Sequence, residues 1–144
     1  MLVYIDRVAD RFNRYKSLLS VLGFVIALYL TITHYTTSIP LACPSTGIID
    51  CGAVLSSKYA VLFGVPLAVM ALAFFIGEIV LIVKNMKEYQ LYLNTIGFFS
   101  LFYTWYAEYL LQRICIYCTA LHIIIIVLFA ISLYEAFGKK QATS

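Results

Sequence analysis

Four cysteines are the residues of this sequence best suited to chemistry. Seven residues lie between Cys43 and Cys51, and Cys115 and Cys118 form a C-x-x-C pair. Residues i and i+3 of a helix place their Cα atoms about 5–6 Å apart, which is within disulfide range. At a helix N-terminus the backbone amides also favour the thiolate, the attacking species in disulfide exchange. The two pairs therefore suit a redox relay that proceeds through a mixed disulfide.

Two other interpretations of the cysteines compete with the relay. A closed four-cysteine zinc site usually takes ligands from C-x2-4-C pairs, and the wide spacing of the first pair disfavours it, so no metal is expected. Two structural disulfides would make the chain a non-catalytic membrane protein. A C-x-x-C ring closes too few residues to restrict an unfolded chain much, which disfavours this alternative.

The elements that must position these cysteines are membrane helices. Of the 144 residues, 63% are hydrophobic, and the mean hydropathy is +0.94. A single domain this small has too little interior to bury so much apolar surface, so the surplus must face lipid. In lipid, helices satisfy every backbone polar group internally. We expect an all-α membrane protein, one domain over residues 1–144, with a four-helix bundle spanning about 17–39, 62–83, 90–112 and 114–136.

Positive charges are distributed unevenly among the connections. Of the ten Lys and Arg residues, eight lie before the first span, between the second and third, or after the fourth. Only Lys58 and Arg113 lie in the other two connections. The positive-inside rule places both termini in the cytoplasm of a multi-pass cell-membrane protein. All four cysteines then face outward, where disulfides are tolerated.

Two segments outside the spans complete the expected architecture. Residues 1–16 carry apolar and charged residues on opposite helical faces, which fits a cytoplasmic interfacial helix and equally a solvated basic tail. Between the first two spans lies an outer loop, residues 40–61, with Cys43 and Cys51. The second half of this loop, residues 52–59, is amphipathic and predicts a short surface helix.

Aromatic residues gather near the expected position of Cys118, one turn into the fourth span. A flat, lipid-soluble, two-electron acceptor suits a cavity there, which predicts a quinone of the ubiquinone or menaquinone type. Phe102 and Tyr106 are the candidates for the wall of this pocket. Aromatic side chains also anchor helices at membrane interfaces, so the cluster alone fits a belt at least as well as a pocket. Its members are Phe98, Phe99, Phe102, Tyr103, Trp105, Tyr106 and Tyr117.

Several motifs occur together along the chain. The loop cysteines are followed by Ser56-Ser57-Lys58-Tyr59, then by Phe63-Gly64-Val65-Pro66, and the C-x-x-C heads the last span. Together they resemble the vitamin K epoxide reductase family over about residues 15–135. We expect a stand-alone, prokaryotic-type member without a fused thioredoxin domain. Bacterial disulfide-forming membrane proteins also have four helices, but their C-x-x-C lies in the first outer loop, the reverse of the order here.

The resemblance implies a role for each cysteine. Cys43 looks like the cysteine that meets a separate thioredoxin-like protein on the outer face, and Cys51 like the one that passes electrons to Cys115. Cys118 looks like the thiol that acts on the quinone. The implied enzyme is a quinone-dependent thiol–disulfide oxidoreductase that supports disulfide formation in exported proteins, with no nucleic-acid partner. We also expect Cys51 on the membrane-proximal side of the loop, and Cys115 as the more exposed member of its pair.

Four further residues have two interpretations each. Ser57 matches a family serine near the active site, but it also fits a helix-end hydroxyl bonded to the backbone. His122 stands where vertebrate members have a tyrosine, and it is either a pocket residue or a histidine bonded to a neighbouring helix. Glu108 is expected to neutralise Arg113 rather than to transfer protons. Glu78 is expected to extend to the cytoplasmic edge of the membrane rather than to stay buried.

Overall fold

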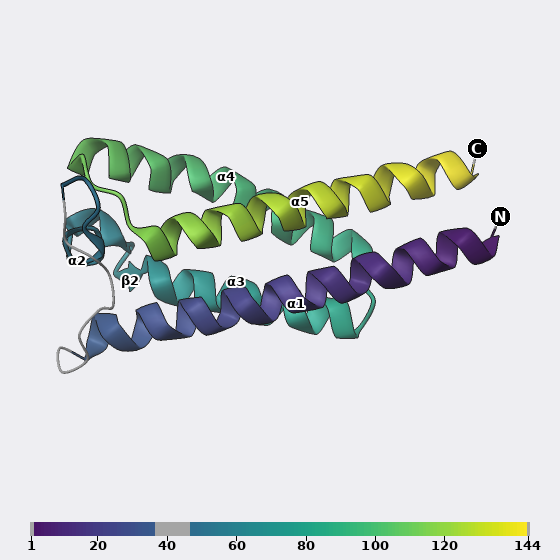
Figure 1. Ribbon diagram of the computed structural model, residues 1–144, viewed down its shortest axis with the longest axis horizontal. Coiled ribbons are helices and arrows are strands. Elements are labelled where there is room, and N and C mark those ends of the chain that lie inside the picture. Colours follow the sequence, from purple (N-terminus) through teal and green to yellow (C-terminus); the bar gives the residue numbers. More distant parts are fainter. Residues whose placement is uncertain (1, 37–46, 144) are drawn as a thin grey trace.

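Four long helices lie lengthwise against one another in the computed structural model, which describes residues 2–36 and 47–143 (Figure 1). With 83% of the described residues helical, the all-α prediction is confirmed. The long helices are α1 (Leu2–Tyr35), α3 (Leu67–Val83), α4 (Lys87–Leu111) and α5 (Ile116–Thr143). The short elements are α2 (Cys51–Leu55), the 3-10 helix η1 (Lys58–Ala60), β1 (Val61–Leu62) and β2 (Val65–Pro66).

The four long helices form a closed ring. Helix α1 packs against α3 and α5, and α4 packs against the same two neighbours. The start of α1, the end of α5 and the turn between α3 and α4 lie at one end of the bundle, and α2 and β2 lie at the other (Figure 1). The segment that contains Cys51 is therefore far from both ends of the chain.

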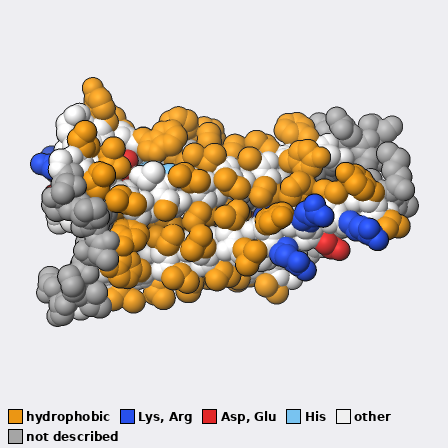
Figure 2. Space-filling model, in the orientation of Figure 1, with side chains coloured by type: hydrophobic (Ala, Val, Ile, Leu, Met, Phe, Trp, Pro, Cys, Tyr) orange, Lys and Arg blue, Asp and Glu red, His pale blue; other side chains and the backbone are white. Residues whose placement is uncertain are grey.

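Two of the described helices are long and apolar enough to cross a membrane. These are the Asp10–Tyr35 part of α1 and the Ile116–Gly138 part of α5, while α3 is apolar but only 17 residues long. On the face shown in Figure 2, hydrophobic side chains cover most of the length of the bundle, and the Lys and Arg side chains lie toward its ends. Both observations fit a protein in lipid. The count of four spans stays a prediction.

Three of the predicted boundaries differ from the structure. Helix α1 runs without a break from Leu2, so residues 1–16 do not form a separate helix. The predicted surface helix of residues 52–59 is divided into α2 and η1. The second long helix begins at Leu67 rather than at residue 62, because residues 61–66 form a hairpin.

The hairpin is a consequence of a tight turn between β1 and β2. Val61 pairs with Pro66 and Leu62 pairs with Val65 in antiparallel register. The two turn residues, Phe63 and Gly64, have φ values of 54° and 81°, which suits the turns that join two-residue hairpins. A positive φ disfavours a bulky residue such as phenylalanine, so the sequence signal for this turn was weak.

A buried polar cluster joins all four long helices near the end that holds the termini. Lys16 Nζ lies 2.8 Å from Glu135 Oε2 and donates a 2.8 Å hydrogen bond to Gln90 Oε1. Asn94 Nδ2 donates to Glu78 Oε1 at 3.2 Å. The expectation that Glu78 extends to the membrane edge is wrong, because its side chain is fully buried against Asn94. Burial of an ionisable group at this depth requires such partners.

Candidate active site

The C-x-x-C pair lies at the start of α5. Cys115 is the residue before the helix, and its Sγ accepts a 3.3 Å hydrogen bond from the backbone N–H of Cys118, while its carbonyl accepts one of 2.9 Å from Thr119. The sulfur therefore caps the helix in the way that a serine or aspartate oxygen usually does. Both cysteines are free thiols in this structure.

The position of Cys115 as the cap of α5 explains why its side chain is buried and why its pKa is lowered. The expectation that Cys115 is the more exposed of the two is wrong: it is 0% exposed, whereas Cys118 is partly exposed. A hydrogen bond from the Cys118 thiol lowers the pKa of Cys115, against the effect of burial, and the backbone amides of Cys118 and Tyr117 add to this. Cys115 is therefore the member of the pair that ionises more readily.

A short backbone ladder ties the outer loop to the residue before Cys115. The N–H of Ile114 donates to the carbonyl of Ile48 at 2.8 Å, and the N–H of Asp50 donates to the carbonyl of Ile114 at 3.1 Å. These bonds form a parallel bridge between Ile49 and Ile114. Arg113 adds a side-chain bond from Nη1 to the carbonyl of Gly47.

The ladder brings the backbones of two cysteines into one neighbourhood. Asp50 caps α2, accepting a 3.0 Å hydrogen bond from the N–H of Ala53 at Oδ1. Cys51 follows as the first residue of α2, just as Cys115 follows Ile114. Cys43 lies outside the described residues.

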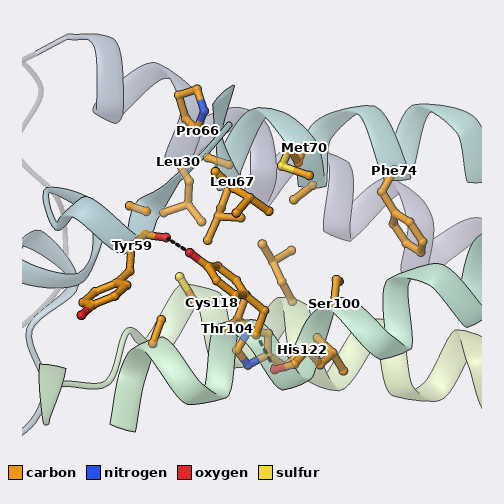
Figure 3. A pocket seen from close by; sticks show the side chains of 18 of the residues that line it. Leu30, Tyr59, Pro66, Leu67, Met70, Phe74, Ser100, Thr104, Cys118 and His122 are labelled. Carbon is orange, nitrogen blue, oxygen red and sulfur yellow. Dashed lines mark hydrogen bonds between the residues drawn. The ribbon is translucent and has the colours of Figure 1, made fainter. Parts of the chain in front are cut away.

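A cavity of about 550 Å³ lies beside Cys118, within the size range of small-molecule sites. It is enclosed by residues from all four long helices and from the α2–η1 segment. Figure 3 shows Tyr59 and Cys118 toward one end of the cavity and Phe74 toward the other. Most of the lining side chains are apolar, among them Leu30, Leu67, Met70, Phe74 and Ile125.

Histidine 122 is one of the few polar side chains in this lining (Figure 3). The indole Nε1–H of Trp105 donates to His122 Nδ1 at 3.1 Å. An indole nitrogen can only donate, so Nδ1 is unprotonated and the neutral ring carries its proton on Nε2. The Nε2–H group has no hydrogen-bond partner among the described residues. His122 therefore lines the cavity and is bonded to a neighbouring helix, and its part in a quinone pocket stays a prediction.

Ser57 also lines the cavity, where its hydroxyl donates to the carbonyl of Val54 at 2.8 Å. The backbone-bonded interpretation of this residue is correct, and the oxygen keeps its acceptor capacity. Tyr103 lines the same region, and its hydroxyl donates to the carbonyl of Tyr59 at 3.3 Å. This bond ties α4 to the segment that follows the loop cysteines.

Phe102 and Tyr106 do not line the cavity, in contrast to the expectation. Their side chains are 53% and 60% exposed on the outer surface of the bundle, where they suit an aromatic belt. Residues four apart share one helical face, and here that face points away from the cavity. The signal that identifies the inner face is instead a stripe of small or polar residues at helical spacing: Ser100, Thr104, Ala107 and Glu108.

Glu108 lies in this stripe and is not paired with Arg113. The structure shows no ion pair for Glu108 among the described residues. The Arg113 side chain is instead bonded to the carbonyl of Gly47. The expectation that Glu108 neutralises Arg113 is therefore wrong.

A thiol pair at the head of a membrane helix, next to an apolar cavity, is an arrangement suited to membrane redox chemistry of disulfides. The chain matches the vitamin K epoxide reductase family over residues 16–133, and it belongs to that family. Members are membrane-integral oxidoreductases that generally use quinone-type substrates and work with thioredoxin-like partners. The matched range includes all four cysteines and most of the bundle.

Proposed function

We propose that the protein is a quinone-dependent thiol–disulfide oxidoreductase with four transmembrane helices, α1, α3, α4 and α5. Electrons pass from a thioredoxin-like partner to Cys43 and Cys51, then to Cys115 and Cys118, and finally to a quinone. The observation that carries this proposal is the ladder between Ile48–Asp50 and Ile114, which holds the start of α2 against the C-x-x-C.

The relay requires two successive disulfide exchanges. The Cys51 thiolate attacks the Cys115–Cys118 disulfide at Cys115, which forms a Cys51–Cys115 bond and releases Cys118 as a thiolate that takes up a proton. Cys43 then attacks Cys51, which closes the Cys43–Cys51 disulfide and frees Cys115. Each round moves two electrons inward, and the thiols of the partner return the loop pair to its reduced form.

The cavity supports a quinone as the acceptor. Its apolar lining suits a flat ring, and the Nε2–H of His122 is available to donate to a carbonyl oxygen. Met70 of α3 and Ile96 of α4 line the cavity and are also exposed on the outer surface. These two residues mark the side of the cavity where a lipid-soluble tail would enter.

The function is tested by quinone reduction with the purified, pre-reduced protein. A soluble short-chain quinone should be reduced in stoichiometric amounts by the protein alone, and catalytically when a small dithiol is added. A membrane protein with only structural disulfides would show neither reaction, so loss of both contradicts the proposal.

The proposed orientation has both termini in the cytoplasm and the cysteines outward, in the cell membrane. It is supported by the excess of positive charge at the end of the bundle that holds the termini. In a variant without native cysteines, Lys58→Cys should react with a membrane-impermeant thiol reagent in intact cells, and Lys84→Cys only after permeabilisation. Both side chains are exposed, so the reverse result would mean that the orientation is inverted.

A further inference from the structure

Glu108 is a carboxylate placed next to the thiol pair without a charged partner. It lines the same cavity as Cys118. The backbone N–H of Cys115 hydrogen-bonds the carboxylate, yet the Oε1 atom is buried with no hydrogen-bond partner within ordinary distance. A buried acceptor without a donor destabilises the fold, so its presence calls for an explanation, of which a catalytic role is one.

Two other titratable groups that line the cavity near Cys118, His122 and Tyr103, are less suited to take up a proton. Trp105 already occupies Nδ1 of His122, and the Tyr103 hydroxyl is bonded to the carbonyl of Tyr59. The α3 residues in the lining are all apolar, so α3 supplies no competing group. The titratable groups in the lining are His34 from α1, Tyr59 from η1, Tyr103 and Glu108 from α4, and Cys118 and His122 from α5.

The charge of Glu108 acts on the thiols. Its carboxylate raises the pKa of Cys115, in opposition to the hydrogen bond from Cys118 that lowers it. A negative group that disfavours a second negative charge beside it is well placed to take up the proton that a thiol loses.

We propose that Glu108 is the proton acceptor for the Cys115–Cys118 pair when these thiols reduce the quinone. The inference rests on the proposed function and assigns a residue to its chemical step. Two thiols supply two electrons and two protons as the S–S bond forms, which is what a quinone needs to become a quinol. Glu108 takes the proton from the Cys118 S–H, holds it while the thiolate reacts, and gives it to one quinone oxygen. It passes the Cys115 proton to the other quinone oxygen in the same way. The carboxylate is thereby regenerated, and no other oxidant or reductant is required.

The test compares Glu108→Gln with Glu88→Gln in the full-length, pre-reduced protein. Glutamine keeps the size and polarity of the side chain at 108 but cannot take up a proton. Glu88 is an exposed carboxylate at the start of the same helix, so its variant controls for loss of charge. Reduction of a soluble quinone should fall on the order of 10²-fold or more in Glu108→Gln, the usual contribution of general acid–base catalysis. Glu88→Gln should match the unmodified protein, and Glu108→Asp should recover part of the rate.

Thiol ionisation provides a second readout, which should change in the opposite direction. Without the carboxylate, Cys115 ionises at lower pH, so the ultraviolet absorbance of the thiolate should appear at lower pH in Glu108→Gln than in the unmodified protein. This readout requires no reagent to reach the buried sulfur. Slower turnover with easier ionisation is not expected of a side chain that only supports the fold. If Glu108→Gln keeps the original rate and pH profile, or loses turnover with thiolate absorbance unchanged, the inference is overturned. If the unmodified protein reduces no quinone, the proposed function fails, and the inference fails with it.

Discussion

Replacing Cys118 by alanine should abolish quinone reduction with every electron donor. Cys118 is the thiol that opens on the cavity, whereas the Cys115 sulfur is fully buried as the cap of α5. Without Cys118 no dithiol remains next to the quinone, so the rate with a small dithiol or with a protein partner should fall to the uncatalysed rate. Absorbance of the quinone during single turnover measures this directly.

Replacing Cys43 by alanine provides the matched control, with a different expected result. A small dithiol can attack the Cys115–Cys118 disulfide at Cys118, which is partly exposed and lines the cavity, so turnover with this donor should be kept. Turnover with a thioredoxin-like protein should be lost, because a folded partner is too large to enter the cavity. If the Cys43 variant loses activity toward both donors, the loop pair does not serve as the shuttle for protein thiols.

The fold was largely predictable because lipid imposes helices on long apolar runs. The runs that became α1, α3, α4 and α5 were identified to within a few residues at most ends. The hairpin at residues 61–66 was not predicted. Its apolar residues cannot be told from the start of a helix, and phenylalanine, as at position 63, is unusual at a positive φ. The sequence also did not show that residues 2–16 are part of α1. An amphipathic segment can continue a membrane helix beyond the membrane boundary, and no residue type marks the place where the two join.

The place of the C-x-x-C pair was predictable from the sequence, but its contacts were not. Its spacing indicated a pair at a helix N-terminus, and the structure places Cys115 and Cys118 at the start of α5, while their redox role stays a prediction. Spacing could not show that the sulfur of Cys115 turns inward to cap α5, nor which face of α4 points inward. Aromatic residues drew attention to Phe102 and Tyr106, whereas the small and polar stripe through Thr104 and Glu108 marks the cavity.

The pairing of the outer loop with Ile114 was beyond sequence reasoning, because it joins segments more than sixty residues apart through backbone atoms. Nearly every residue has the backbone groups that form these hydrogen bonds, so the side-chain types do not show which segments pair. Once the pairing is known, it changes the meaning of the burial of Cys115: solvent thiols and a folded partner cannot approach this sulfur freely, whereas a residue held by the ladder can. Burial thus favours exchange within the chain over exchange with an outside thiol.

A Cys51–Cys115 disulfide should therefore be the species that accumulates when Cys43 or Cys118 is removed. Without Cys43, the mixed bond formed by attack of Cys51 on Cys115 lacks the thiol that resolves it toward the loop. Without Cys118, attack of Cys115 on the Cys43–Cys51 disulfide gives the same bond, which lacks the thiol that resolves it toward the cavity. Removing both leaves two thiols and no disulfide, so the same bond should then form when an added thiol oxidant such as diamide takes up the two electrons. Mass spectrometry of the non-reduced, digested variants identifies the linked peptides.

The ladder itself can be tested through the rate at which this bond forms. A disulfide requires Cα atoms no more than about 7 Å apart, and the bonds of Gly47, Ile48 and Asp50 to residues 113 and 114 restrain the start of α2 in that neighbourhood. Arg113→Ala removes the side-chain bond to Gly47. With diamide added as the oxidant, it should slow the formation of the Cys51–Cys115 bond in the variant that lacks Cys43 and Cys118. Lys58→Ala removes a positive charge of the same region without touching the ladder and should leave the rate unchanged. A Cys43–Cys115 bond in the variant that lacks only Cys118, or equal effects of Arg113→Ala and Lys58→Ala, would show that the ladder does not select Cys51 as the shuttle.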